Sequence, residues 1–176
     1  MNDPAALVEG LIEALALKDL PRAGWVRRGL EQPESVAAHS WGVAWLTVAL
    51  LPPDLDLGKA LAYAVLHDLA EVRVGDLTPH DGVSADDKAH REARAMRELC
   101  TNLPAQLVER WLAYERQADP EARFVRQLDR LDMALQAAAY AQRTGMDLTE
   151  FFRSARKAVH TPGLLTLLDA IEARQP

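Results

Sequence analysis

Stretches of mixed apolar and polar residues, each long enough for a helix, alternate along the chain with short breaks rich in proline, aspartate and glycine. Three stretches open with a capping residue followed by proline, an arrangement typical of helix starts, at residues 3–4, 119–120 and 161–162. Ser35 and Ser84 open two more stretches. No segment shows the two-residue alternation of a strand. The pattern therefore predicts an all-α chain of about seven or eight helices.

The breaks also mark where the main helices end. Helical patterns are expected over residues 36–51, before two prolines, and over residues 85–100. A further helix is predicted over residues 57–72, after an aspartate cap. The longest pattern covers residues 120–144 and stops at Gly145, which suits a left-handed C-terminal cap.

The length and composition fit one compact domain. The chain has 176 residues, of which 49% are hydrophobic and 26% charged, and it shows no internal repeat and no Gly/Ser linker. We therefore predict a single domain over residues 1–176. Within it, the motifs described below occupy about residues 20–140, and C-terminal helices are expected at about residues 148–174.

Charge and cysteine content narrow the function. The formal net charge of −6 argues against a broad phosphate-binding surface, so no nucleic-acid partner is expected. The single cysteine, Cys100, cannot form an internal disulfide, and the most apolar run, residues 43–51, is too short to span a bilayer. The N-terminal residues lack the pattern of a secretory signal. We expect a cytoplasmic protein with no membrane partner.

Helical periodicity divides residues 57–72 into two faces. One face is apolar and is expected to pack in the core: Leu61, Val65, Leu69 and Val72. The other face combines small and ionisable residues: Ala60, Ala64, His67, Asp68 and Glu71. Small alanines beside three ionisable groups suggest a cavity. For this helix alone, a solvated face with an incidental His–Glu pair fits equally well.

Four segments carry a more specific signal. They are residues 22–25 (RAGW), 34–40 (ESVAAHS), 67–76 (HDLAEVRVGD) and 127–129 (QLD). In order and spacing, these segments closely resemble the HD-domain 5'-deoxynucleotidases. The resemblance implies an HD-domain helical bundle and a phosphohydrolase that releases phosphate from (deoxy)ribonucleoside 5'-monophosphates. It also implies a homodimer.

The resemblance assigns expected roles to individual residues. Four residues would hold a metal ion: His39, His67, Asp68 and Asp129. Two would move protons and place water: Glu71 and Asp76. Three would contact the substrate, at the sugar, the pocket wall and the phosphate respectively: Trp25, Ser40 and Arg22.

Two of these assignments meet alternatives in the sequence. Periodicity alone favours Asp132 over Asp129 as a ligand, because Asp132 lies nearer the apolar stripe of its helix. The resemblance favours Asp129, and Asp132 stays the alternative. Some family members carry arginine immediately before the tryptophan, where this chain has Gly24. Arg22 is therefore the expected phosphate clamp, because a guanidinium can bind two phosphate oxygens at once.

Two imidazoles and two carboxylates form a mixed nitrogen and oxygen donor set. Such a set suits one divalent transition metal ion: manganese, cobalt, iron, nickel or zinc. Four protein ligands leave coordination positions for water and for a phosphate oxygen, so the expected site is catalytic, with hydroxide as the nucleophile. The expected partner is a small-molecule nucleotide substrate.

Other functions compete with this one. An alarmone or nucleoside triphosphate hydrolase would use the same ligands, although alarmone hydrolases usually carry an acid where this chain has Val72. A non-catalytic helical module that binds metal or nucleotide is the third interpretation.

Two groups of apolar residues bear on packing and assembly. Three tryptophans are expected to pack between helices: Trp41, Trp45 and Trp111. Leucines of the C-terminal helices are the expected contacts of a homodimer: Leu164, Leu165 and Leu168.

Overall fold

The computed structural model describes residues 3–174, so the first two and last two residues of the predicted domain lie outside the described part. The described residues are mostly helical, with one isolated bridge between Pro21 and Ser35 and no β-strand, which confirms the all-α prediction. The helices, including two short 3-10 helices labelled η, are α1 (Pro4–Leu15), η1 (Ala16–Lys18), α2 (Ala23–Arg27), α3 (Val36–Leu50), α4 (Leu57–Leu66), α5 (Glu71–Val74), α6 (Ala85–Leu99), η2 (Cys100–Asn102), α7 (Gln106–Glu115), α8 (Pro120–Thr144), α9 (Thr149–Ala158) and α10 (Pro162–Glu172).

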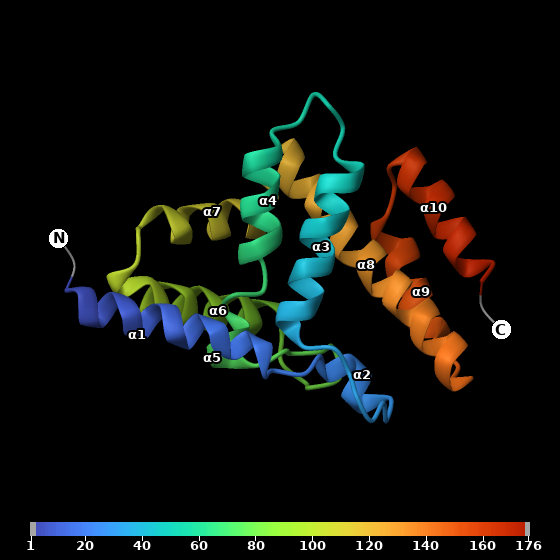
Figure 1. Cartoon of the computed structure of the whole chain (residues 1–176), viewed down its shortest axis with the longest axis horizontal. Helices are drawn as coiled ribbons and strands as arrows, with labels where there is room; N and C mark the ends of the chain where they lie inside the picture. The colour runs from blue at the N-terminus through green and yellow to red at the C-terminus, as the bar shows by residue number, and fades with distance from the viewer. Residues whose placement is uncertain (1–2, 175–176) are drawn as a thin grey trace.

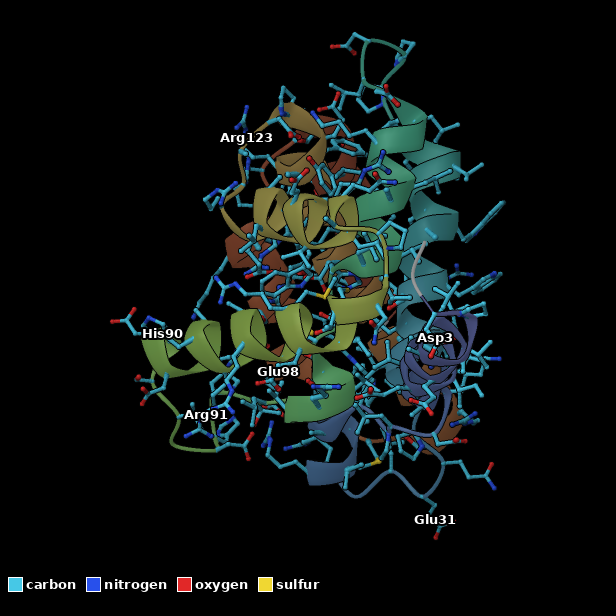
Figure 2. The ribbon with its side chains drawn as sticks, turned by 90° about the vertical axis from the view of Figure 1, so that its left-hand side faces the viewer. Asp3, Glu31, His90, Arg91, Glu98 and Arg123 are labelled. Atoms are coloured by element: carbon cyan, nitrogen blue, oxygen red, sulfur yellow. The ribbon has the colours of Figure 1, made fainter. Side chains whose placement is uncertain are left out.

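Three helices form the centre of the molecule. In Figure 1, α3 and α4 stand side by side and the long α8 crosses them, and each of the three contacts the other two. α9 and α10 pack on α8, and α1, α5 and α6 form a layer beneath the centre. α6 turns polar side chains outward, as Figure 2 shows for His90 and Arg91. Within residues 3–174, none of the helices has the combined length and apolar character that crossing a membrane requires.

The apolar side chains divide between two buried clusters. The larger cluster joins the central helices to α9 and α10 and includes Val43 and Leu128, both fully buried. The smaller cluster lies beneath it, around α6 and α7, and includes Met96 and Trp111. α3 runs from one cluster to the other, because Val36 at its start belongs to the smaller cluster. We call the boundary between the two clusters the seam.

Side-chain caps support most of the predicted helix starts. Oxygen atoms of five residues accept a backbone N–H in the first turn of their helices: Asp3, Ser35, Asp56, Ser84 and Asp119. Thr161 occupies the capping position of α10 but makes no side-chain bond there. α2 and α5 are short helices that the pattern did not predict, and they bring the number of helices above the expected seven or eight.

The predicted helix over residues 57–72 is wrong in its second half. α4 stops before His67, and the hydrogen bonds that follow join residues three positions apart instead of four. The N–H of Glu71 donates to the carbonyl of Asp68 at 3.0 Å. In a continuing α-helix, Glu71 would donate to the carbonyl of His67. That carbonyl instead accepts the indole N–H of Trp111 at 3.1 Å. A contact with α7 therefore ends α4, and the chain turns into α5.

The predicted core face of residues 57–72 is partly wrong: Leu69 is buried in the smaller cluster and Val72 packs against it, but α4 packs through a different face. Val65, expected in the core, is 57% exposed, whereas Ala60 and Ala64 are fully buried. α4 packs against both α3 and α8. The face with small side chains is buried because it allows the close approach that dense interior packing requires.

The predictions for the tryptophans and the C-terminal leucines are partly wrong. Trp111 is buried between helices as predicted, but Trp41 and Trp45 on α3 are 71% and 56% exposed. Leu164 and Leu168, expected at a dimer contact, are buried in the larger cluster. Trp41 and Trp45 of α3 are therefore available for contact with another molecule, whereas Leu164 and Leu168 of α10 are not.

Gly145 ends α8 in the left-handed conformation, with φ of 71° and ψ of 9°, as predicted. We expect Gly145→Ala to lower the free energy of unfolding by about 1 kcal/mol, because a Cβ atom disfavours this conformation. Gly163→Ala is the matched control: Gly163 is helical, and no neighbouring atom lies within 4 Å of an added Cβ at either position. Urea unfolding measures both, and equal stability of the two variants would contradict the prediction.

Candidate metal centre and its cavity

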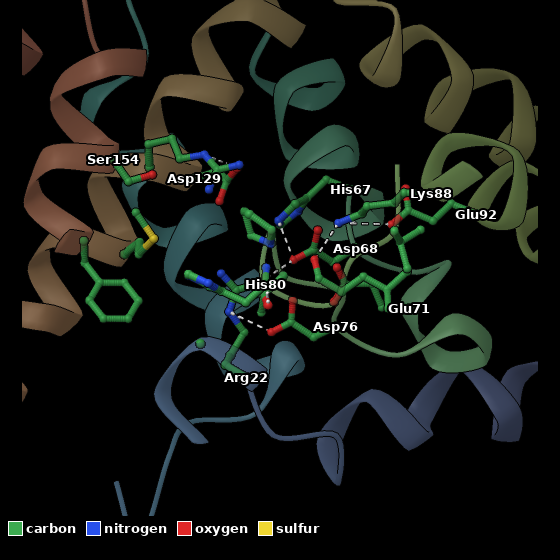
Figure 3. A pocket seen from close by; sticks show the side chains of 18 of the residues that line it. Arg22, His67, Asp68, Glu71, Asp76, His80, Lys88, Glu92, Asp129 and Ser154 are labelled. Atoms are coloured by element: carbon green, nitrogen blue, oxygen red, sulfur yellow. Dashed lines mark hydrogen bonds and ion pairs between the residues drawn. The ribbon is translucent and has the colours of Figure 1, made fainter. Parts of the chain in front are cut away.

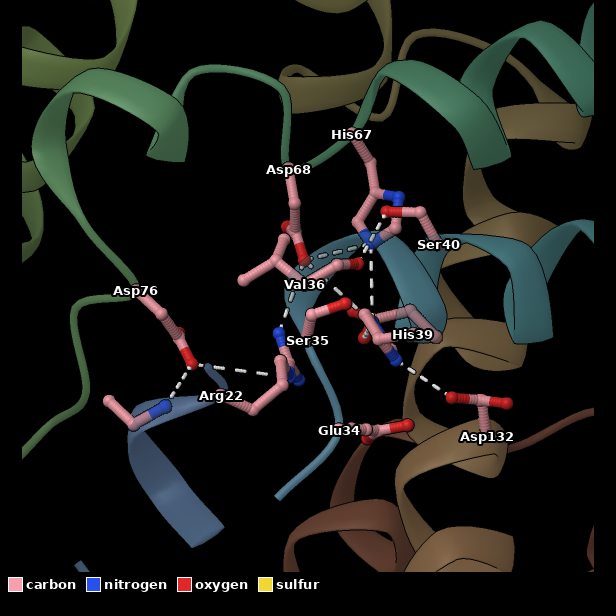
Figure 4. A network of polar contacts seen from close by, with 12 residues as sticks. Arg22, Glu34, Ser35, Val36, His39, Ser40, His67, Asp68, Asp76 and Asp132 are labelled. Carbon is pink, nitrogen blue, oxygen red and sulfur yellow. Dashed lines mark hydrogen bonds and ion pairs between the residues drawn. The ribbon is translucent and has the colours of Figure 1, made fainter. Parts of the chain in front are cut away.

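Three predicted ligands meet at the seam from three different parts of the chain. His39 lies on α3, His67 directly follows α4, and Asp129 lies on α8. The Nε2 atoms of the two histidines are 3.3 Å apart, and Oδ1 of Asp129 lies 3.2 Å from Nε2 of His39. All three side chains are buried. The fourth predicted ligand, Asp68, places Oδ2 at 3.1 Å from Nε2 of His67, as Figure 4 shows.

The remaining nitrogen of each imidazole is engaged outside this group. Nδ1 of His67 lies 2.9 Å from the carbonyl oxygen of Ala64, which can only accept, so a neutral His67 ring would carry its proton on Nδ1 and present the lone pair of Nε2. Nδ1 of His39 lies 2.7 Å from Oδ2 of Asp132. The Nε2 atoms and two carboxylates thus face one another. A divalent transition ion is the group that this nitrogen and oxygen set fits.

The charges around His39 also favour a bound cation. Burial and the nearby Arg22 lower the pKa of His39, but hydrogen bonds to Asp129 and Asp132 outweigh them and raise it to about 9. Burial raises the pKa of Asp129, whereas Arg130 and His39 lower it well below its usual range. The group therefore carries excess negative charge, which attracts a cation.

Glu71 is a buried carboxyl group at the start of α5, with an exposed fraction of 4%. Its Oε2 atom has no hydrogen-bond partner among the described residues. Burial, together with Asp68 and Asp76, raises the pKa of Glu71 to about 10. A carboxyl group with an unpaired oxygen beside a cation site is suited to exchange a proton with water.

Arg22 links two of the predicted acidic residues. Its Nη1 lies 3.1 Å from Oδ2 of Asp68, and its Nε lies 4.0 Å from Oδ2 of Asp76. Asp76 also accepts the backbone N–H of Ala23 at 2.7 Å. The backbone at the start of α2 is also held by the N–H of Arg22, which donates to the carbonyl of Glu34 at 3.0 Å. Burial lowers the pKa of Arg22, but the surrounding carboxylates raise it overall, so the guanidinium remains charged.

A cavity of about 740 Å³ opens in front of this group. Its wall contains seven of the nine predicted site residues: Arg22, Trp25, His67, Asp68, Glu71, Asp76 and Asp129. His39 lies behind the wall, fully buried. Ser40 is also absent from the wall, and its hydroxyl donates to the carbonyl of Val36 at 3.0 Å. Its predicted contact with substrate therefore gains no support from the geometry.

Trp25, the residue expected at the sugar, is also packed in the core. Only 2% of the residue is exposed, and its ring packs against Phe151 and Tyr140 at centroid distances of 4.1 and 5.2 Å. Its Nε1–H donates to Oε1 of Glu34 at 2.9 Å. The same residue forms part of the cavity wall. Trp25 is thus a core aromatic residue that borders the cavity.

Outside the motifs, the sequence marks Lys88 and Glu92, four residues apart on one helical face, as possible residues of the pocket rim, and the structure places both in the cavity wall; the rest of that wall was not predicted. Figure 3 shows Lys88 and Glu92 of α6 reaching toward the motif residues, with Nζ and Oε1 3.4 Å apart. α8 contributes four wall residues: Arg126, Asp129, Arg130 and Met133. Their spacing of three and four residues marks one face of a helix, so the position of Asp129 alone could have identified the other three. α9 adds Phe151 and Ser154.

Known proteins share this sequence and this fold. The HD domain family model matches residues 14–165. The human 5'-deoxynucleotidase HDDC2 is 34% identical over 165 residues, which cover 90% of this chain and 81% of the human protein. The 5'-deoxynucleotidase hdd1 of Schizosaccharomyces pombe is 33% identical over 169 residues, covering 90% and 85%.

A solved structure supports the same relationship. The PH0347 protein of Pyrococcus horikoshii OT3 is 31% identical and superimposes with a TM-score of 0.80, covering 96% of this chain and 99% of that one. The resemblance first noted over about residues 20–140 thus extends across most of the chain in both sequence and fold. The chain belongs to the HD domain family, among the 5'-deoxynucleotidases.

Proposed function

We propose that this protein is a metal-dependent 5'-nucleotidase that hydrolyses (deoxy)ribonucleoside 5'-monophosphates to a nucleoside and phosphate. The observation that carries the proposal is a set of two histidines and two aspartates, three of which line a cavity together with a buried carboxyl group, Glu71, that has an unpaired oxygen. The relatives named as 5'-deoxynucleotidases support the choice of substrate. They favour it over an alarmone, a nucleoside triphosphate or a non-catalytic module.

The proposed ligands of one manganese, cobalt, iron, nickel or zinc ion are His39, His67, Asp68 and Asp129. When bound, such an ion supplies positive charge that polarises a phosphate oxygen and makes a water molecule more acidic. As a carboxylate, Glu71 would accept a proton from such a water molecule. A nucleotide monophosphate is small enough for the cavity of about 740 Å³.

The side chains divide the proton transfer and the binding between them. The oxygen of water forms a bond to phosphorus, its proton passes to Glu71, and the bond to the 5'-oxygen breaks. Glu71 then protonates the departing nucleoside oxygen. Asp76 holds Arg22 and the start of α2 in place, and the guanidinium of Arg22 binds phosphate oxygens. Trp25 borders the sugar.

A phosphate-release assay tests the substrate and the ion together. The protein is stripped with a chelator, reloaded with one divalent ion at a time, and offered deoxy- and ribonucleoside mono-, di-, tri- and cyclic phosphates. We expect phosphate from the monophosphates only, and only after reloading. Preference for a triphosphate or an alarmone would replace the proposed substrate. Tight nucleotide binding without release would instead indicate a non-catalytic module.

We also propose that two copies of the chain form a dimer through α3. Trp41, Trp45 and Val48 follow one another at spacings of four and three residues and are each more than half exposed. Val65 of the adjacent α4, 57% exposed, extends this apolar face. Large apolar patches on soluble proteins usually mark interaction sites, and a twofold axis would match this face with its own copy.

Replacing both tryptophans of this face should separate the copies. We expect the double variant Trp41→Arg, Trp45→Arg to have the mass of one chain in light scattering, where the wild type has the mass of two, because each arginine would be buried without a partner. Leu167→Arg on α10, at a residue 39% exposed, is the control. A monomer produced by the control alone would move the interface to the C-terminal helices.

A further inference from the structure

Asp132 makes the closest contact with a proposed metal ligand from outside the donor set. Its Oδ2 lies 2.7 Å from Nδ1 of His39, within the range of a charge-assisted hydrogen bond. Asp129, one helical turn earlier on α8, approaches the other nitrogen, Nε2, at 3.2 Å. The two aspartates of α8 therefore approach opposite sides of one imidazole ring, and Figure 4 shows Asp132 on the far side of His39 from His67.

A neutral imidazole carries one proton, so the two nitrogens of His39 differ in role. A proton on Nδ1 is accepted by the carboxylate of Asp132 and leaves the lone pair of Nε2 directed toward His67 and Asp129. A proton on Nε2 would occupy the position that a metal ion needs. The shorter contact on the Nδ1 side favours the first arrangement.

Gly42 makes room for this contact. It lies in the interior of α3, one turn after His39, where glycine is an unfavourable residue. A Cβ atom at this position would lie 2.2 Å from Oδ1 of Asp132 and 2.9 Å from its Cγ. Any other residue at position 42 would push the carboxylate away from the ring. Glycine at position 42 is therefore explained by the space that the Asp132 carboxylate occupies, and not by the backbone conformation of α3.

Glu34 offers an alternative use of the same atoms. Glu34, His39 and Asp132 could together hold a second ion, because one ligand atom from each lies within 4.8 Å of the others. Oε1 of Glu34 already accepts the indole N–H of Trp25. His39 would also have to give up its last proton to bind one ion at each nitrogen. A single ion, with Asp132 holding the ring, needs neither change.

We propose that Asp132 is a positioning residue of the metal centre: its carboxylate accepts the Nδ1–H of His39, fixes the orientation of the ring, and directs Nε2 to the ion, while Gly42 leaves the space for it. The inference rests on the proposed metal site. It also gives Asp132, which periodicity favoured as a ligand, a role one step removed from the ion.

Cobalt binding to the metal-free protein tests this role without reference to turnover. The affinity is measured by competition with a chelator, and the geometry by the visible absorption spectrum of bound Co²⁺. We expect Asp132→Ala to weaken binding about 10- to 100-fold and to change the spectrum, with one ion still bound per chain. Asp132→Asn should fall between the wild type and Asp132→Ala, because the amide oxygen can accept the same N–H.

Gly42→Ala adds a variant in which Asp132 itself is intact. We expect weaker Co²⁺ binding, because the added methyl group displaces the carboxylate. Gly163→Ala and the exposed Asp86→Ala are the matched controls and should bind Co²⁺ as the wild type does. Circular dichroism of the metal-free variants establishes that each is folded. Should Gly42→Ala fail to fold, the Asp132 variants carry the test.

The outcomes separate this inference from the proposed function. If the wild type binds Co²⁺ and Asp132→Ala matches it in affinity and spectrum, the positioning role is wrong and the metal site stands. If Asp132→Ala loses one of two bound ions, Asp132 is a ligand, which also overturns the positioning role. If the wild type binds no divalent ion, the proposed function fails instead.

Discussion

Glu71→Gln should release phosphate from a nucleoside monophosphate about 100- to 10,000-fold more slowly than the wild type while binding the same metal ion. Glutamine preserves the size of the side chain but cannot exchange a proton with water. Oε2 of Glu71 is buried and has no hydrogen-bond partner among the described residues, whereas Oδ2 of Asp76 already accepts the N–H of Ala23. Initial rates under saturating metal, together with Co²⁺ affinity, measure the two properties separately.

Glu121→Gln is the matched control for this experiment. Glu121 is also a buried glutamate, but it lies outside the cavity wall and accepts the N–H of Asp56. Its variant should keep the wild-type rate. A Glu71→Gln protein with full activity would remove Glu71 from the reaction and leave Asp76 as the candidate for proton transfer.

Glu71→Gln should also make the metal-free protein more stable. Because burial raises the pKa of Glu71 from its ordinary value of 4.5 to about 10, its contribution to stability is fully present below pH 4.5 and is lost as the pH rises toward 10. Glutamine stays neutral throughout. Urea unfolding of the metal-free forms at pH 6 and pH 9 should therefore show a larger gain for Glu71→Gln at pH 9.

Metal binding should stabilise the fold strongly, because the proposed ligands join α3, α8 and the segment after α4. At a free ion concentration about 100 times the Kd, the expected gain in free energy of unfolding is about 2.7 kcal/mol. Asp129→Asn should lose most of this gain, because one charged ligand is replaced by a weaker neutral one. Thermal unfolding with Mn²⁺ and with a chelator measures the difference.

Asp86→Asn, at an exposed position in the first turn of α6, is the control and should gain as much from metal as the wild type. A comparison with Asp132→Asn also separates the two acids that the sequence left as alternatives. If Asp129→Asn kept the full gain and Asp132→Asn lost it, the ligand assignment between them would be reversed.

Local chemistry made much of the fold predictable. Caps such as Ser35 and Asp119 and the terminator Gly145 act within a few residues of their helices, so the sequence alone marks them. The end of α4 could not be predicted in this way. It depends on the indole of Trp111, which lies 44 positions from His67 in sequence. Helix periodicity carries no information about such a partner.

In the candidate site, too, the features that depend on contacts between distant residues could not be predicted from the sequence. The resemblance named the ligands, and the structure brings His39, His67 and Asp129 together. The sequence could not show that Asp132 contacts the other nitrogen of His39. Both acids lie on one side of α8, and only the packing of α3 against that side distinguishes them. The exposure of Trp41 and Trp45 could not be predicted either. An apolar residue on a helix predicts burial, but the sequence does not say whether another helix of the same chain covers it.

The position of the donor atoms at the seam has a consequence for biosynthesis. His67 is supplied where the chain passes from the larger cluster to the smaller one, and Asp129 comes from a helix made later in synthesis. α3, α4 and α8 all contribute to the larger cluster, so the packing of this cluster brings the donors together. The proposed ion can therefore be bound only by a chain in which α8 has been synthesised and has packed against α3.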